Sequence, residues 1–160
     1  MLFLNPHKLR KRWQAVQRVR LGRKGENLAC RFLRRQGYFV WKRNWRCRYG
    51  ELDIIAYNDS QLRLIEVKTR SGKSAISFPA IGAVDKEKTR RIEKLAHSFL
   101  LRQRKAMRLR RLTSFAIDAI TVHIPEGFLS RPVITHVQNI GDGFSFSVPQ
   151  RDPARFCNFV

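Results

Sequence analysis

Two alternating segments decide the fold: GELDIIAY at residues 50–57 and LRLIEVKTR at residues 62–70, with NDSQ at 58–61 between them. Both segments are rich in the β-branched and aliphatic residues that favour strands, and Asn, Asp and Ser favour tight turns. The pattern therefore predicts a β-hairpin. A loop of two residues or of four gives the same strand register, in which the numbers of paired residues sum to 119.

In this register Asp53 is opposite Glu66, and Glu51 is opposite Lys68. All four side chains share one face of the hairpin, because residues two apart on a strand point to the same side. Directly opposed side chains have Cβ atoms about 5 Å apart, so two carboxylates at that distance repel each other. A divalent cation held between Asp53 and Glu66 would turn this repulsion into a binding site.

The composition indicates a polyanionic partner. The chain has 160 residues, 33 Lys+Arg against 12 Asp+Glu, and a formal net charge of +21. Residues 1–24 hold eight basic residues and no acid, yet the rest still has 25 basic against 12 acidic residues. Because so basic a surface repels itself, nucleic acid is the expected partner, with an anionic membrane surface as the main competitor.

Other protein classes find little support in the sequence. No run of about 18 apolar residues is present, so no membrane-spanning segment is expected, and the first residues lack the order of charge and apolar run of a secretory signal. The three cysteines are widely spaced and include no CxxC, which favours a reducing cytoplasm over a disulfide framework or zinc site. The GKS at residues 72–74 lacks the upstream glycine of a P-loop.

Periodicity around the hairpin predicts an α/β domain with a mixed β-sheet flanked by helices, in the order αβββαββ. A basic arm at 1–21, a folded α/β domain at 22–140 and a C-terminal extension at 141–160 are the expected divisions. Beside the hairpin, the expected elements are helices over 23–36 and 84–105, strands over 38–45, 115–124 and 133–140, a loop over 71–82 and a short alternating piece at 144–148. The arm is a further helix candidate over residues 8–20.

The hairpin face has the residue types that metal-dependent phosphodiester cleavage requires. Carboxylates such as Asp53 and Glu66 hold hard cations, and a cation such as Lys68 serves the attacking water or the developing negative charge. Glu26 borders the apolar face of the first helix, so packing onto the sheet would bring a further carboxylate over the hairpin. The alternatives are an ordinary strand pair for Glu66 and Lys68, and a helix-dipole role for Glu26.

Basic residues are the candidates for phosphate contact. The predicted nucleic-acid-binding residues are Lys86, Lys88, Arg90, Arg91 and Arg70. Residues 102–111 add six basic residues and no acid, which exceeds what a helix C-terminus needs. Four aromatic residues alternate with Arg and Lys and are candidates for base stacking: Trp13, Trp41, Trp45 and Tyr49. Packing in the core or on the sheet explains Trp41 and Trp45 equally well.

Several motifs in order resemble one bacterial family. They are Gly25-Glu26-x-x-Ala29, Arg43-Asn44-x-Arg46, Gly50-Glu51-Leu52-Asp53-Ile54-Ile55-Ala56, Glu66-Val67-Lys68-Thr69-Arg70 and Val84-x-x-x-Lys88-x-x-Arg91-Ile92-x-x-x-Ala96. Over about residues 22–140 the chain resembles the YraN-like family, which is similar to Holliday junction resolvases and other restriction-endonuclease-like nucleases of the PD-(D/E)xK superfamily.

The resemblance implies that Glu26, Asp53, Glu66 and Lys68 match the nuclease core, with Asp53 and Glu66 as ligands of Mg²⁺ or Mn²⁺ and Glu26 assisting. Roles are less defined for three further motif positions: Glu51, Lys88 and Arg91. The chain departs from the family pattern in one strand, where Ala116-Ile117-Asp118 stands in place of Arg-Phe-Asp. For Asp118 an ion pair with an arginine is expected, and the four histidines are expected to be structural or solvated.

These observations predict a metal-dependent endonuclease-like protein that acts on DNA, with branched structures as the candidate substrate. A non-catalytic nucleic acid-binding module on the same scaffold is the alternative, and a basic adaptor that docks on ribosomes or an acidic protein is a third class. No membrane partner is expected. Junction cleavage would favour a homodimer, although the sequence shows no dimerisation seam.

Overall fold

The computed structural model describes residues 6–72, 86–126 and 130–140, with the backbone alone described at residues 6 and 86–89. The elements follow the predicted order αβββαββ. They are α1 (Pro6–Arg35), β1 (Phe39–Cys47), β2 (Gly50–Asn58), β3 (Gln61–Ser71), α2 (Lys86–Leu109), β4 (Ser114–Ile124) and β5 (Val133–Val137). The alternating piece expected at 144–148 and most of the loop expected at 71–82 lie outside the described residues.

The strands form one five-stranded sheet in the order β1-β2-β3-β4-β5. Neighbouring strands are antiparallel except for β3 and β4, which are parallel. A parallel pair needs a long crossover connection, and α2 lies in the segment that joins these two strands. The predicted class, an α/β fold with a mixed sheet flanked by helices, is therefore confirmed.

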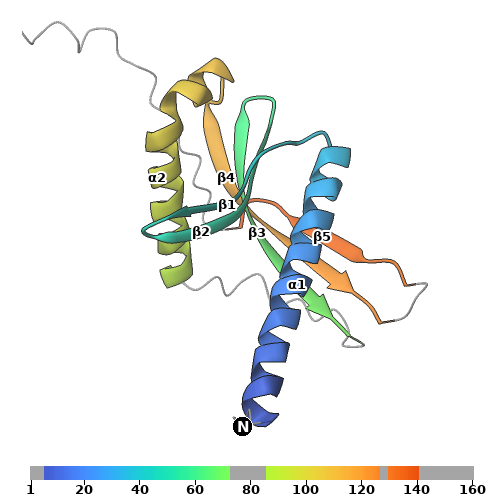
Figure 1. Ribbon diagram of the computed structural model, residues 1–160. Helices are drawn as coiled ribbons and strands as arrows, with labels where there is room; N and C mark the ends of the chain where they lie inside the picture. The colour runs from blue at the N-terminus through green and yellow to red at the C-terminus, as the bar shows by residue number, and fades with distance from the viewer. Residues whose placement is uncertain (1–5, 73–85, 127–129, 141–160) are drawn as a thin grey trace, which may run out of the picture.

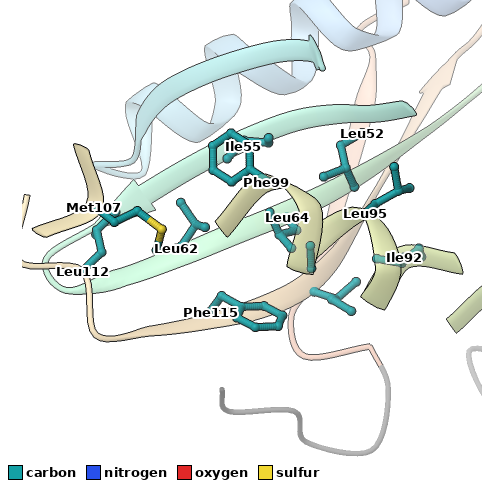
Figure 2. Close-up of a cluster of buried hydrophobic side chains, with 12 residues drawn as sticks. Leu52, Ile55, Leu62, Leu64, Ile92, Leu95, Phe99, Met107, Leu112 and Phe115 are labelled. Carbon is teal, nitrogen blue, oxygen red and sulfur yellow. The ribbon is translucent and has the colours of Figure 1, made fainter. Parts of the chain in front are cut away.

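Each face of the sheet is covered by one helix, as Figure 1 shows. On one face, α2 packs through Ile92, Leu95 and Phe99 against a core that Figure 2 shows in close-up. On the other face, α1 packs through Ala29 and Leu33 onto a second core. Alternate residues of a strand point to opposite faces, so strands with apolar residues on both sides suit a sheet that is covered twice.

Helix α1 is longer than the sequence predicted. A helix was expected to begin near residue 23 after a separate basic arm, but one continuous helix of 30 residues runs from Pro6 to Arg35. Its packed second half supplies a nucleus from which the exposed first half can propagate. The expected boundary between arm and domain therefore falls inside α1. Neither α1 nor any other helix of the described ranges is long and apolar enough to cross a membrane.

A glycine sets how closely α1 approaches the sheet. A Cβ atom placed on Gly25 would lie 1.8 Å from Thr69 Oγ1 and 2.7 Å from Thr69 Cβ. The second atom is fixed to the backbone of β3 and cannot rotate away, so a larger residue at position 25 forces the helix off the strand. The next residue along the helix is Glu26, and the close contact therefore also fixes where that carboxylate lies.

Overpacking usually costs about 1–3 kcal/mol, and the gain in helix propensity of about 1 kcal/mol offsets part of this cost. We therefore expect Gly25→Ala to lower the free energy of unfolding by up to about 2 kcal/mol. The matched control is Gly22→Ala in the same helix, because a Cβ at Gly22 meets nothing within 4 Å. Urea unfolding followed by circular dichroism measures both variants. Equal stabilisation by both would show that α1 does not pack on Thr69 as described.

Candidate functional site

The hairpin has the predicted register, but its ladder ends before the acidic pair. Paired residues run from Asn58 and Gln61 to Ile54 and Ile65, and each pair sums to 119. Asp53 would come next, yet its Oδ2 accepts a hydrogen bond from the backbone N–H of Val67 at 2.8 Å. The Asp53 carboxylate thus accepts the hydrogen bond that a backbone carbonyl of β2 would accept if the β2–β3 ladder continued. The expected direct opposition of Asp53 and Glu66 is therefore wrong, because the two strands separate at this point.

Strand β2 also changes face at Asp53. Ile54 belongs to the core under α1, whereas Leu52 belongs to the core under α2, although residues two apart normally share a face. The pairing with β1 skips the position of Asp53, where the facing residue of β1 is Asn44. Asn44 has a φ of 49°, a left-handed conformation that Asn tolerates better than most residues. This local twist turns the Asp53 backbone out of both ladders.

Glu26 reaches the site from the α1 face. Its Oε2 accepts a hydrogen bond from Asn44 Nδ2 at 2.9 Å and lies 3.6 Å from Arg43 Nη2. Its side chain is only 16% exposed. Packing of α1 on the sheet therefore brings this acid toward the hairpin, as expected from its position on the helix. No role was predicted for Arg43 or Asn44, although both belong to a motif quoted above and the tolerance of Asn for the left-handed conformation was an available signal.

The neighbouring carboxylates and burial both affect the pKa of Asp53. Burial is the largest cause that raises the pKa of Asp53 above its ordinary value, and the nearby charges of Glu26, Glu66 and Glu51 raise it further. The hydrogen bond from Val67 opposes this shift. Within the described ranges, no three acidic, histidine or cysteine side chains are grouped closely enough to hold a metal ion by themselves. The site therefore holds concentrated negative charge without a complete protein ligand cage among the described residues.

A cleft of about 250 Å³ opens between β2, β3 and α2. Its polar walls are Glu51, Asp53, Glu66 and Arg91, and its apolar walls include Leu52, Leu64, Ile92 and Leu95. Figure 2 shows these apolar side chains gathered where α2 crosses the hairpin. Two of the predicted metal ligands and one predicted phosphate-binding arginine thus line the same cleft.

Other predicted site residues do not line this cleft. Lys68 is exposed two residues beyond Glu66 on β3, and Glu26 is on the opposite side of the sheet from α2. Glu51 was expected opposite Lys68, but it pairs instead with Arg46 of β1, whose Nε donates to Glu51 Oε2 at 3.0 Å. The expected pairing of Glu51 with Lys68 is therefore wrong, because the β1–β2 register places Arg46 beside Glu51.

The predicted phosphate-binding residues occupy two places. Arg90 is exposed and Arg91 lines the cleft, both in the first half of α2, and Arg70 is exposed at the end of β3. Lys86 and Lys88 belong to the first turn of the same helix, where only the backbone is described. The far end of α2 carries exposed basic residues of the 102–111 run, and Arg110 lies over the ring of Trp41 at 4.5 Å. Trp41 and Trp45 pack against Phe99, which is the structural role that the sequence left open.

Asp118 has the structural role that the sequence favoured. It is fully buried, and its Oδ1 accepts hydrogen bonds from Arg63 Nη1 at 3.1 Å and from the backbone N–H of Asn139 at 2.9 Å. Its Oδ2 lies 2.9 Å from His136 Nε2. Arg63 pairs with Ala116 in the β3–β4 ladder. Strand β3 therefore supplies an arginine beside the position where the family pattern has one on β4.

Comparison with known proteins identifies the family. The model of "Uncharacterised protein family UPF0102" matches residues 25–122. The UPF0102 protein of Mycobacterium avium is 45% identical over 128 residues, which cover 79% of this chain and 93% of that protein. The chain belongs to the UPF0102 family. The UPF0102 protein of Nocardia farcinica is 42% identical over 120 residues, or 75% of this chain and 87% of that protein. A UPF0102 protein of Mycobacterium tuberculosis is 38% identical over 131 residues, which cover 80% of this chain and 97% of that protein.

Membership of the UPF0102 family confirms the YraN-like resemblance that the sequence motifs carried. The family match includes Glu26, Asp53, Glu66 and Lys68, and it begins at Gly25, the residue that packs on Thr69. The first half of α1 lies outside it. The acidic cleft is therefore in the part of the fold that the UPF0102 model covers, whereas the basic helical extension is not.

Proposed function

We propose that this UPF0102 protein is a metal-dependent endonuclease-like enzyme that hydrolyses phosphodiester bonds in DNA, with branched DNA as the candidate substrate. The observation that carries the proposal is the break in the hairpin. Asp53 leaves both strand ladders there and shares one cleft with Glu66 and Arg91. A strand pair gains no stability from such an arrangement, whereas a site for a cation and a phosphate does use it.

The oxygen donors suit Mg²⁺ or Mn²⁺. Mg²⁺ is usually bound by one or two carboxylates together with substrate phosphates and waters, so it needs no full protein cage. Asp53 and Glu66 would hold the ion, with Glu26 assisting through its effect on Asp53. When bound, the ion would supply Lewis-acid activation of water and of the phosphate. The hydrogen bond from Val67 fixes one oxygen of Asp53 and orients the other.

The basic residues complete the proposed site. Arg91 lines the cleft and would bind the phosphate beside the acidic pair. Lys68 is exposed on β3 and would serve the attacking water or the transition state once DNA covers that surface. The net charge of +21 would bring the polyanion to the cleft. A cytoplasmic location accords with this function and stays a prediction.

Glu66→Gln tests the proposal, with Glu126→Gln as the matched control, because Glu126 is an exposed acid two residues beyond the end of β4. Plasmid, flap and four-way junction DNA are incubated with purified protein and Mg²⁺, Mn²⁺ or EDTA. We expect cutting that requires the metal and falls at least about 100-fold in Glu66→Gln, because a lost ligand removes several kcal/mol of transition-state stabilisation.

The control should cut like the wild-type protein. If Glu66→Gln cuts as fast as Glu126→Gln, the activity comes from a contaminant or from another site, and the assignment fails. Differential scanning fluorimetry with Mn²⁺ gives a readout apart from activity: the metal should raise the unfolding temperature of the wild-type protein more than that of Glu66→Gln.

The second candidate function is a non-catalytic nucleic acid-binding module on the same scaffold. It is favoured by the lack of a three-ligand group among the described residues and by the position of Lys68 outside the cleft lining. Binding of the same DNA substrates without cutting, with an affinity that falls steeply with salt, would support this module over the enzyme.

A further inference from the structure

Residues 8–20 of α1 show no packing contact with any other element that the structure describes. From residue 7 to residue 20 every side chain is exposed apart from the half-buried Gln17. Figure 1 shows this part of the helix, in dark blue, extending beyond the strands. The apolar contacts of α1 begin only at Leu28. A helix that gains nothing from tertiary packing depends on propensity alone or on a partner.

The charge of this segment opposes its folding in isolation. Residues 6–24 carry eight basic residues and no acid. Like charges one helical turn apart destabilise a helix by a few tenths of a kcal/mol per pair, and no acidic side chain within the segment offsets them. A polyanion that runs along the helix would remove this repulsion and would stabilise the helical form.

The same segment exposes an aromatic ring. Trp13 is 64% exposed, the most exposed tryptophan of the chain, since Trp41 and Trp45 pack against Phe99. Leu9 and Val16 lie one turn to either side of it and are also exposed. An indole ring held among cations on a solvated helix provides a stacking surface for an unpaired base, and the cations provide contacts for the flanking phosphates.

Neither a lipid surface nor a second copy of the chain fits this segment as well. Membrane-surface helices separate a continuous apolar face from a polar face. Here Arg12 and Arg20 lie one turn to either side of Val16, within the apolar side of the helix. A second copy would place another eight cations against the first eight. Nucleic acid neutralises all of them.

We infer that residues 8–24 of α1 form a second nucleic-acid-binding surface that prefers unpaired strands, with Trp13 stacking on a base and the flanking Lys and Arg side chains contacting phosphates. This surface is separate from the cleft and lies outside the UPF0102 match. The inference extends the proposed function, since it takes nucleic acid as the partner, but it requires neither a metal ion nor cleavage.

The test measures binding of a fluorescein-labelled oligothymidylate by anisotropy, with the full-length protein in EDTA so that no cutting occurs. Trp13→Leu should weaken binding about 5- to 100-fold, the loss of one stacked base, while Trp13→Phe, which keeps an aromatic ring, should bind within a few-fold of the wild-type protein. The oligonucleotide should also quench the tryptophan fluorescence of the wild-type protein, and this quenching should disappear in Trp13→Leu.

Glu126→Gln, which removes an exposed acid outside both the cleft and residues 8–24, serves as the control and should bind the oligonucleotide like the wild-type protein. Because binding is measured in EDTA and needs no cutting, failure of the cleavage assay and failure of this inference are distinguishable. Equal affinity of Trp13→Leu and wild type would overturn the inference. Two other results would also overturn it. The first is a blue shift of tryptophan fluorescence on anionic phospholipid vesicles, without quenching by the oligonucleotide. The second is a dimer in gel filtration that is lost in Trp13→Leu but kept in Trp13→Phe, again without quenching by the oligonucleotide.

Discussion

Asp53→Asn should raise the unfolding temperature at pH 7 and, in the same protein, reduce metal-dependent DNA cleavage by at least about 100-fold. Both effects have one origin. The Asp53 carboxylate lies partly buried among three other acids, an arrangement that costs stability in the absence of a cation. Asparagine retains an oxygen that can accept the hydrogen bond from Val67, so the backbone geometry at the strand break is kept.

The sign of the pH dependence follows from the raised pKa of Asp53. Since the folded protein holds this proton more tightly than the unfolded chain does, the ionised carboxylate destabilises the fold above the folded-state pKa. The cost declines as the pH falls through that value and is absent below the ordinary value of 3.8. The stability advantage of Asp53→Asn should therefore be full at pH 7 and should vanish in acid.

Thermal unfolding between pH 7 and pH 3.5, in EDTA and at constant ionic strength, measures this advantage. Asp59→Asn is the matched control, because Asp59 is exposed in the hairpin turn and Asn tolerates its φ of 46° equally well. A variant that loses both activity and stability at pH 7 would contradict the proposed role, because it would make Asp53 a structural residue.

Asp118→Leu should lower the free energy of unfolding by about 3–5 kcal/mol, the usual cost of leaving one partner of a buried ion pair uncompensated. Arg63 is only 7% exposed, and its Nε already lacks a hydrogen-bond partner among the described residues. Without Asp118 the guanidinium keeps, among the described residues, only the contact with Asn139 Oδ1 at 3.1 Å. His136 and the backbone N–H of Asn139 lose their acceptor as well.

A double-mutant cycle separates the ion pair from general packing. Arg63→Met should cost less than Asp118→Leu, because Asp118 would still contact His136 and accept from Asn139. The double variant Arg63→Met/Asp118→Leu should recover part of the loss, since apolar residues often replace a buried pair without net cost. Urea unfolding at pH 7 measures all four proteins. A cost below about 1 kcal/mol for Asp118→Leu would show that the network contributes little.

Much of this architecture follows from local patterns. Two alternating segments separated by the turn residues 58–61 were enough to predict the β2–β3 register, because a loop of two residues or of four gives the same pairing. The 3.6-residue period of α2 and the apolar runs of β4 and β5 were equally local signals. The motifs pointed to the family, and their order indicated that Glu26, Asp53 and Glu66 belong to one site.

Tertiary contacts decided the rest. The sequence alone determined the αβββαββ order, the hairpin register, the basic character of the surface and the choice of Asp53 and Glu66 as the acidic pair. Only the folded chain showed that Asp53 leaves its ladder to accept from Val67, because this depends on a left-handed Asn44 in another strand. It also showed that Glu51 pairs with Arg46, that Asp118 pairs with Arg63, and that the basic arm continues as one helix into the domain. These outcomes depend on competition between partners distant in sequence, and periodicity carries no information about which partner prevails.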